Sequence, residues 1–254
     1  MVGHIPATRD KELTDKVNSM WEALVKENHL IELDWRRLLK ELEDLEKTSP
    51  GMILLQSVMW AFKQNNANVD RALNRYVGFY GKDIHWYMCR ASIGPLLGRT
   101  SMVTDIIDNC YPASSINGLI TVMNAAAQTG MFISAKRAYQ DLVGLGVDNI
   151  EERSYIRLPI TLVAADYMIE HGIDERAVAD RIQVAHAIAK QHARTNTFSV
   201  LANEFGVTIE YLIDAEIEQL VDINLDISEA LCSKFEDTLS EHISLGVTQA
   251  NVKE

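Results

Sequence analysis

Apolar positions recur at steps of three and four residues along most of the chain, which is the spacing of one face of an α-helix. The clearest case is the stretch from residue 119 to 147, where two such stripes are separated by Gln128-Thr129-Gly130. Glycine readily adopts the left-handed backbone conformation that ends a helix. This stretch therefore predicts a helical hairpin that turns at Gly130. The apolar stripes are Leu119, Val122, Met123 and Ala126, and then Ile133, Ala135, Ala138, Tyr139 and Leu142.

The same arrangement recurs elsewhere in the chain. After Gly130, a small residue comes at plus five, an aromatic at plus nine and an apolar residue at plus twelve. The small residue lets two helices approach closely, and the aromatic fills the space one turn further on. Placing Ala67 at the turn reproduces this spacing, and weaker versions start at Gly98 and Gly172. The positions are Ala135, Tyr139 and Leu142 in the first case, and Ala72, Tyr76 and Phe79 in the second.

This repeated spacing resembles the helical hairpins of tetratricopeptide and pentatricopeptide repeat proteins over residues 52–185. The resemblance implies an all-α fold of stacked antiparallel hairpins that wind into a right-handed superhelix. It also implies an extended groove lined by the first helix of each hairpin. The full tetratricopeptide pattern is not present, and the period is slightly short for either family.

The remaining segments complete the predicted architecture. Two helices within residues 8–47 form an N-terminal pair, which we interpret as the cap of the repeats. The segment 221–227 alternates apolar and polar residues and predicts one short strand, followed by a helix over 228–244 and a frayed end. We therefore predict three parts: a cap over 1–50, hairpin repeats over 51–172 and an acidic helical region over 173–254.

Charge is distributed unevenly along the chain. The net charge is −12, of which −11 lies in residues 151–254, whereas residues 51–150 carry +2. An acidic surface repels phosphate backbones and attracts basic partners. No apolar run approaches the roughly 18 to 20 residues that a membrane helix needs, and the three cysteines are few and widely spaced. These features predict a cytoplasmic protein without membrane contact.

Two motifs in the acidic region resemble known binding sites, but each lacks residues that such a site needs. Residues 198–216 carry small, glycine and apolar residues at helix-turn-helix positions, yet the helix that would enter DNA has four acidic and no basic side chains. Asp222, Asn224 and Asp226 match alternate ligands of an EF-hand loop, but the glycine and the final glutamate that such a loop needs are missing. We favour a packed helical hairpin for the first motif and a half-buried strand for the second.

Other candidate sites are incomplete or have a simpler explanation. His85 and Cys89 share a helical face, with Cys110 as a possible third ligand, but a structural zinc site needs about four. The sequence has no known catalytic or phosphate-binding motif, so we predict no catalytic residue, metal or cofactor. A group of aromatics on two first helices could line a groove, but such residues more often belong to the core. They are Trp60, Phe62, Trp86 and Tyr87.

These observations favour a non-enzymatic interaction module whose groove binds a peptide or helix of another protein, possibly a basic one. Polar residues on the first helices are the candidate contacts: Gln56, Lys63, Arg90 and Asn124. The alternative is a nucleic-acid-binding regulator, which the repeat resemblance suits and the net charge disfavours.

Overall fold

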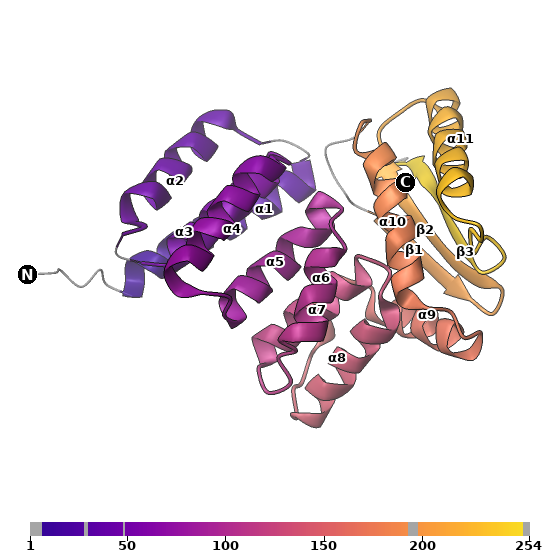
Figure 1. The fold of residues 1–254 in the computed structure, drawn as a ribbon, viewed down its shortest axis with the longest axis horizontal. Coiled ribbons are helices and arrows are strands. Elements are labelled where there is room, and N and C mark those ends of the chain that lie inside the picture. Colours follow the sequence, from indigo (N-terminus) through magenta and orange to yellow (C-terminus); the bar gives the residue numbers. More distant parts are fainter. Residues whose placement is uncertain (1–6, 28–29, 48, 193–197, 251–254) are drawn as a thin grey trace, which may run out of the picture. The chain divides into compact units, whose positions relative to one another are not determined.

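The computed structural model describes residues 7–27, 30–47, 49–192 and 198–250, and it is mostly helical (Figure 1). Within these ranges it contains eleven α-helices, one short 3-10 helix and three β-strands. The chain forms two compact units, Met1–Leu97 and Gly98–Glu254, which are described separately. The predicted boundaries at residues 50 and 172 fall inside these units.

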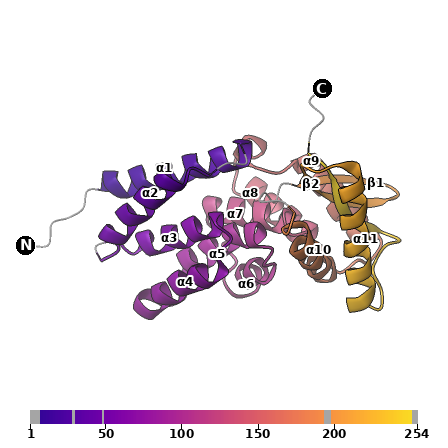
Figure 2. The ribbon, with the colours of Figure 1, turned by 90° about the horizontal axis from the view of Figure 1, so that it is seen from above.

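The described residues of the first unit form five helices. The first helix buries Leu13, Val17 and Leu24 on one side. Helix α3 contacts α1, α2, α4 and α5 (Figure 2). The side chain of Asn65 accepts a hydrogen bond from the Asn68 amide at 3.1 Å and caps α4. The helices are α1 (Ala7–Glu27), α2 (Glu32–Leu45), α3 (Gly51–Phe62), α4 (Asn66–Tyr80) and α5 (Ile84–Leu97).

The second unit begins with helices that match the predicted hairpin elements. Gly130 has φ +77° between two of them, and a Cβ there would lie 2.3 Å from Ile182 Cδ1, so glycine serves both the turn and the close approach of α10. Glu175 of α10 accepts a hydrogen bond from the Ser134 amide at 2.8 Å, in the first turn of α8. The elements are α6 (Ser101–Asn109), α7 (Ile116–Ala127), α8 (Phe132–Gly144), η1 (Glu151–Arg153), α9 (Leu158–Glu170) and α10 (Glu175–Ala189).

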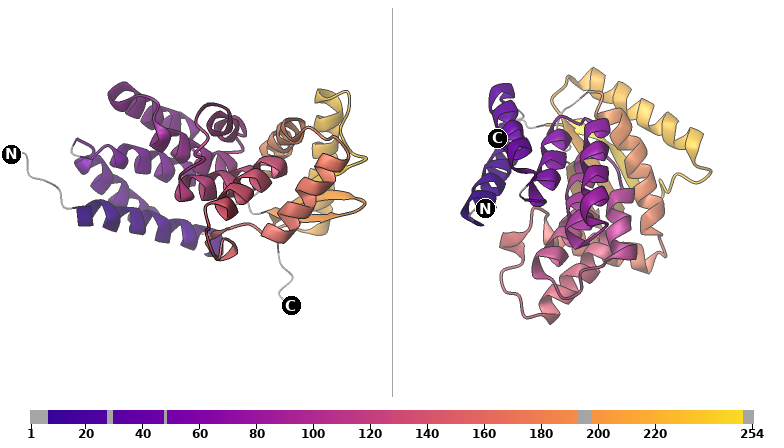
Figure 3. Two further views of the ribbon diagram at one scale, coloured as in Figure 1. Left: turned by 90° about the horizontal axis from the view of Figure 1, so that it is seen from below. Right: turned by 60° about the vertical axis from the view of Figure 1, so that its left-hand side comes forward.

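A three-stranded sheet and a last helix complete the second unit. Strand β2 (Gly206–Ile213) is central, with β1 (Phe198–Asn203) antiparallel on one side and β3 (Ile243–Gln249) parallel on the other. Alternate residues of β2 are buried, and Tyr211 and Ile213 share a core with α10 and α11 (Ile217–Lys234). Both helices therefore cover one face of the sheet (Figure 3).

The sheet corrects several predictions for the acidic region. Residues 198–213, interpreted as a helix-turn-helix or a helical hairpin, form the β1–β2 hairpin, because the alternating residues of β2 pack on the two helices. The predicted strand over 221–227 is instead part of α11, and the helix predicted over 228–244 ends at Lys234. Residues 246–249, predicted to be frayed, belong to β3. The described part of the chain has three strands where at most one was expected, while the mostly helical character is confirmed. Superhelical stacking stays a prediction.

Candidate functional site

Gln56 is buried inside the first unit rather than exposed in a groove. Its Nε2 donates to Glu46 Oε2 at 3.1 Å, and its Oε1 accepts from the Arg75 guanidinium. Arg75 also pairs with Glu46 at 2.9 Å. This network joins the end of α2 to α3 and α4, so Gln56 is occupied by internal contacts.

Asn124 has a comparable internal role in the second unit. It is 8% exposed, and its Oδ1 accepts hydrogen bonds from Ser154 Oγ at 3.2 Å and from the Tyr155 amide at 3.0 Å. These bonds hold the segment that precedes α9 against α7. A partner that contacted Gln56 or Asn124 would therefore have to displace these internal hydrogen bonds, so their role in partner binding stays a prediction.

Lys63 and Arg90 lie nearer the surface of the first unit, and each contacts an aromatic ring. Lys63 pairs with Glu32 and lies 5.2 Å from the centre of the Trp35 ring, while the Arg90 guanidinium lies 4.4 Å from that of Trp86. Cation–π contacts of this kind stabilise the local packing. The four predicted residues therefore divide between the units, three in the first and Asn124 in the second.

The predicted aromatic group contributes mainly to packing. Trp60 meets Trp35 edge to face with ring centres 4.8 Å apart, and Phe62 stacks on Trp21 at 5.6 Å. Trp86 and Tyr87 contact each other at 4.9 Å. These contacts agree with the interpretation of the four aromatics as core residues.

The candidate metal ligands do not assemble into a site. Cys89 contacts Ser57 Oγ at 3.2 Å, and burial raises the pKa of its thiol to about 11, so it stays protonated at neutral pH. Asp222, Asn224 and Asp226 lie on α11 and not in a loop. Across the described ranges, no three His, Cys, Asp or Glu side chains are placed to hold a metal ion.

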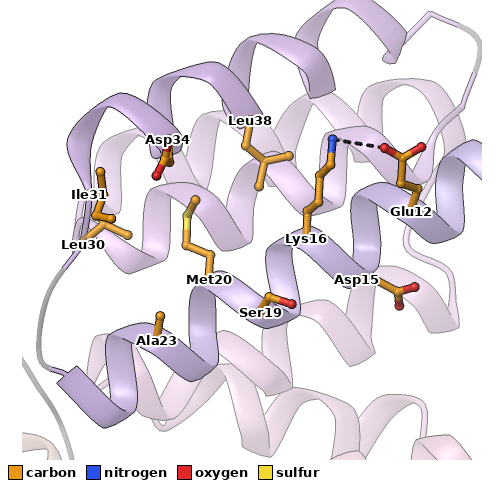
Figure 4. A pocket seen from close by; sticks show the side chains of 10 residues that line it. All are labelled: Glu12, Asp15, Lys16, Ser19, Met20, Ala23, Leu30, Ile31, Asp34 and Leu38. Carbon is orange, nitrogen blue, oxygen red and sulfur yellow. Dashed lines mark ion pairs between the residues drawn. The ribbon is translucent and has the colours of Figure 1, made fainter.

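An open groove between α1 and α2 is the candidate site that the structure adds (Figure 4). Its volume is about 540 Å³. Residues of α1 beside its buried stripe line one wall. The other wall consists of the two residues before α2 and of residues in the first half of α2. The apolar lining residues are Met20, Ala23, Leu30, Ile31 and Leu38, and the polar ones are Glu12, Asp15, Lys16, Ser19 and Asp34.

The apolar part of the groove remains partly open to solvent. Leu38 is buried and Met20 and Ala23 are half-buried, whereas Ile31 is 55% exposed. In Figure 4, Met20 and Leu38 project into the space between the two helices, and Ile31 lies at one end of this space beside the start of α2. Burying this surface against an apolar group would release water and favour binding.

The polar residues give the groove an acidic character. Three carboxylates accompany one ammonium, and Lys16 contacts Glu12 at 3.1 Å and Glu41 at 3.2 Å. Hydrogen bonds from Lys16 and Arg9 lower the pKa of Glu12, so this carboxylate is ionised at neutral pH. An acidic groove attracts a partner that carries Lys or Arg.

Sequence reasoning missed this groove because its walls come from two helices whose relative packing no local pattern specifies. The sequence does place apolar residues at positions 30, 31 and 33, and the structure leaves Ile31 and Leu33 exposed at the start of α2.

Comparison with known proteins gives no further assignment: no family model, curated protein or solved structure matches this chain. None of the helices in the described ranges combines the length and the apolar character that a membrane crossing requires.

Proposed function

We propose that this protein is a non-enzymatic interaction module and that the groove between α1 and α2 holds an amphipathic segment of another protein. The observation that carries the proposal is the combination of a half-open apolar surface with an acidic rim in one groove. The segment would place apolar side chains against Met20 and Ile31 and a Lys or Arg near Asp15 and Asp34. Helices and peptides that bind in grooves use this division between apolar anchors and charged flanks.

The structure supplies a matched pair of residues for the test. Ile31 and Leu33 are each 55% exposed, but only Ile31 lines the groove. Full burial of an aliphatic side chain contributes about 1.5–3 kcal/mol. Because Ile31 is already partly covered, its burial would contribute about 1 kcal/mol, or about fivefold in Kd.

The experiment is affinity capture from native lysate with nuclease treatment, using the wild-type chain, Ile31→Ser and Leu33→Ser as baits. We expect a defined protein partner that survives nuclease, binds Leu33→Ser normally and binds Ile31→Ser about fivefold more weakly when the purified pair is titrated. A partner that binds both variants equally would refute the groove as the site. Loss of the partner with nuclease would favour the nucleic-acid alternative, and an empty capture with folded bait would count against an interaction module.

A further inference from the structure

Helix α11 of the second unit carries two apolar stripes rather than one. The first stripe, Leu220, Ile223, Ile227 and Leu231, is buried against the sheet and α10. The second stripe faces solvent: Ile217 is 71% exposed, Val221 52% and Leu225 56%. These three residues are spaced by four and therefore lie along one side of the helix.

A row of carboxylates lies directly beside the exposed stripe. At 100° per residue, Glu218, Asp222, Asp226 and Glu229 occupy the next sector of the helix, and all four are exposed. The sole basic side chain of α11 is Lys234 at its end, where its Nζ lies 5.6 Å from the centre of the Phe235 ring. The stripe is thus flanked on one side by negative charge along most of its length.

The other flank of the stripe is closed by a side-chain contact to the sheet. Asn224 Nδ2 donates to the Val247 carbonyl at 3.1 Å, and the Val247 amide donates to Asn224 Oδ1 at 2.8 Å. Asn224 therefore occupies the outward backbone groups of Val247 on edge strand β3. An added strand would have to displace this pair, so the surface favours a helix over an extended peptide.

We infer that the face formed by Ile217, Val221 and Leu225 is a second docking surface, and that it binds a basic amphipathic helix of another protein. The partner helix would cover the three apolar side chains and place Lys or Arg residues over the carboxylate row. The stripe from Ile217 to Leu225 is about 12 Å long at 1.5 Å per residue, which corresponds to between two and three turns of the partner.

Charge argues against a second copy of this chain as the occupant. A symmetric antiparallel pair of α11 helices would bring the two carboxylate rows alongside each other, and like charges repel. A partner helix with Lys or Arg on its flank is instead attracted by the same row of carboxylates. This inference does not depend on the groove between α1 and α2, which lies in the other unit.

The test is fluorescence anisotropy with a labelled helical peptide that has a leucine stripe and a lysine flank. The matched probe replaces each lysine with glutamate. The full-length chain is used with Ile31→Ser as the background, so that binding in the first unit is weakened. The variants are Val221→Ser with Leu225→Ser together, and Leu201→Ser as the control, because Leu201 is an equally exposed residue (54%) of the same unit on β1.

We expect the lysine peptide to bind, the double variant to weaken it about tenfold or more, and Leu201→Ser to leave it unchanged. Neutralising Asp222 and Asp226 as Asn should also weaken binding and reduce its salt dependence. Equal binding of the glutamate peptide, equal binding by the double variant, or no binding of the lysine peptide would overturn the inference. So would self-association of the wild type, seen by sedimentation, that the double variant abolishes. All substituted residues are exposed, and circular dichroism checks that each variant is folded.

Discussion

His186 makes the stability of the second unit depend on pH. Its imidazole on α10 is only 3% exposed, lies edge to face on Tyr211 with ring centres 5.8 Å apart, and packs on Gly98, where a Cβ would come within 2.0 Å of the ring. Its Nε2 is buried and has no hydrogen-bond partner among the described residues. Burial, and secondarily the charge of Lys190, lowers the pKa of His186 from 6.5 to about 4.

The direction of the effect follows from this lowered pKa. The unfolded chain binds a proton near pH 6.5 and the folded chain resists it until about pH 4, so acid favours unfolding across this window. The stabilising contribution of neutral His186 is complete about one pH unit above 6.5. It falls by about 2 kcal/mol at pH 5 and about 3 kcal/mol at pH 4.

The assay is urea unfolding of the wild type and His186→Leu at several pH values between 5 and 7.5. The variant removes the titrating imidazole but keeps the carboxylates. At each pH, the difference between the two free energies of unfolding therefore reports the contribution of His186 alone. We expect the wild type to lose about 2 kcal/mol relative to the variant between pH 7.5 and pH 5. Parallel pH profiles would refute the conclusion that His186 is buried in its neutral form.

Two further predictions concern backbone positions in the second unit. Gly130→Ala should destabilise this unit by about 1–3 kcal/mol, because alanine is disfavoured at φ +77° and its Cβ would lie 2.3 Å from Ile182 Cδ1. Urea unfolding measures the change, and an unchanged midpoint would contradict the packing of α10 on Gly130. Asn224→Ala should lower the free energy of unfolding by about 1–3 kcal/mol and expose the edge of β3, because the backbone amide and carbonyl of Val247 lose their side-chain partner. Hydrogen exchange of the Val247 amide should accelerate, and unchanged protection would refute the contact.

The helical part of the fold could be predicted because local periodicity and glycine positions determine it. The N-terminal pair and the helices on either side of Gly130 follow from apolar stripes, and Gly130, Gly146 and Gly172 all have the positive φ expected at helix ends. Asp174 caps α10 and accepts a hydrogen bond from the Arg176 amide at 3.0 Å.

The sheet was missed because the alternating pattern of a strand was assigned to residues 221–227, which are helical, and a helical pattern was assigned to residues 198–213, which form strands. Val207, Ile209, Tyr211 and Ile213 alternate and are buried as strand residues are, but nearby small residues suggested helices instead. Conversely, exposed Val221 and Leu225 interleave with buried residues of α11 and imitate the alternation of a strand. The exposed apolar face of α11 therefore led to the wrong assignment of this segment as a strand.

The site residues were harder to predict than the helices. Gln56 and Asn124 are polar residues on first helices, as the groove hypothesis required, but each forms hydrogen bonds inside its own unit. Whether a polar side chain on a helix faces solvent or a neighbouring helix depends on tertiary packing, which helical periodicity alone does not specify.

The central claim, a partner segment in the groove between α1 and α2, is tested most directly by methyl NMR of the methionines. Met20 lines the groove, whereas Met52 and Met59 are buried in the same unit. Adding an amphipathic peptide with an apolar face and lysine flanks should shift the Met20 signal selectively, and Ile31→Ser should weaken that titration about fivefold. An unchanged Met20 signal at saturating peptide, or the same shift with glutamate flanks, would contradict the account.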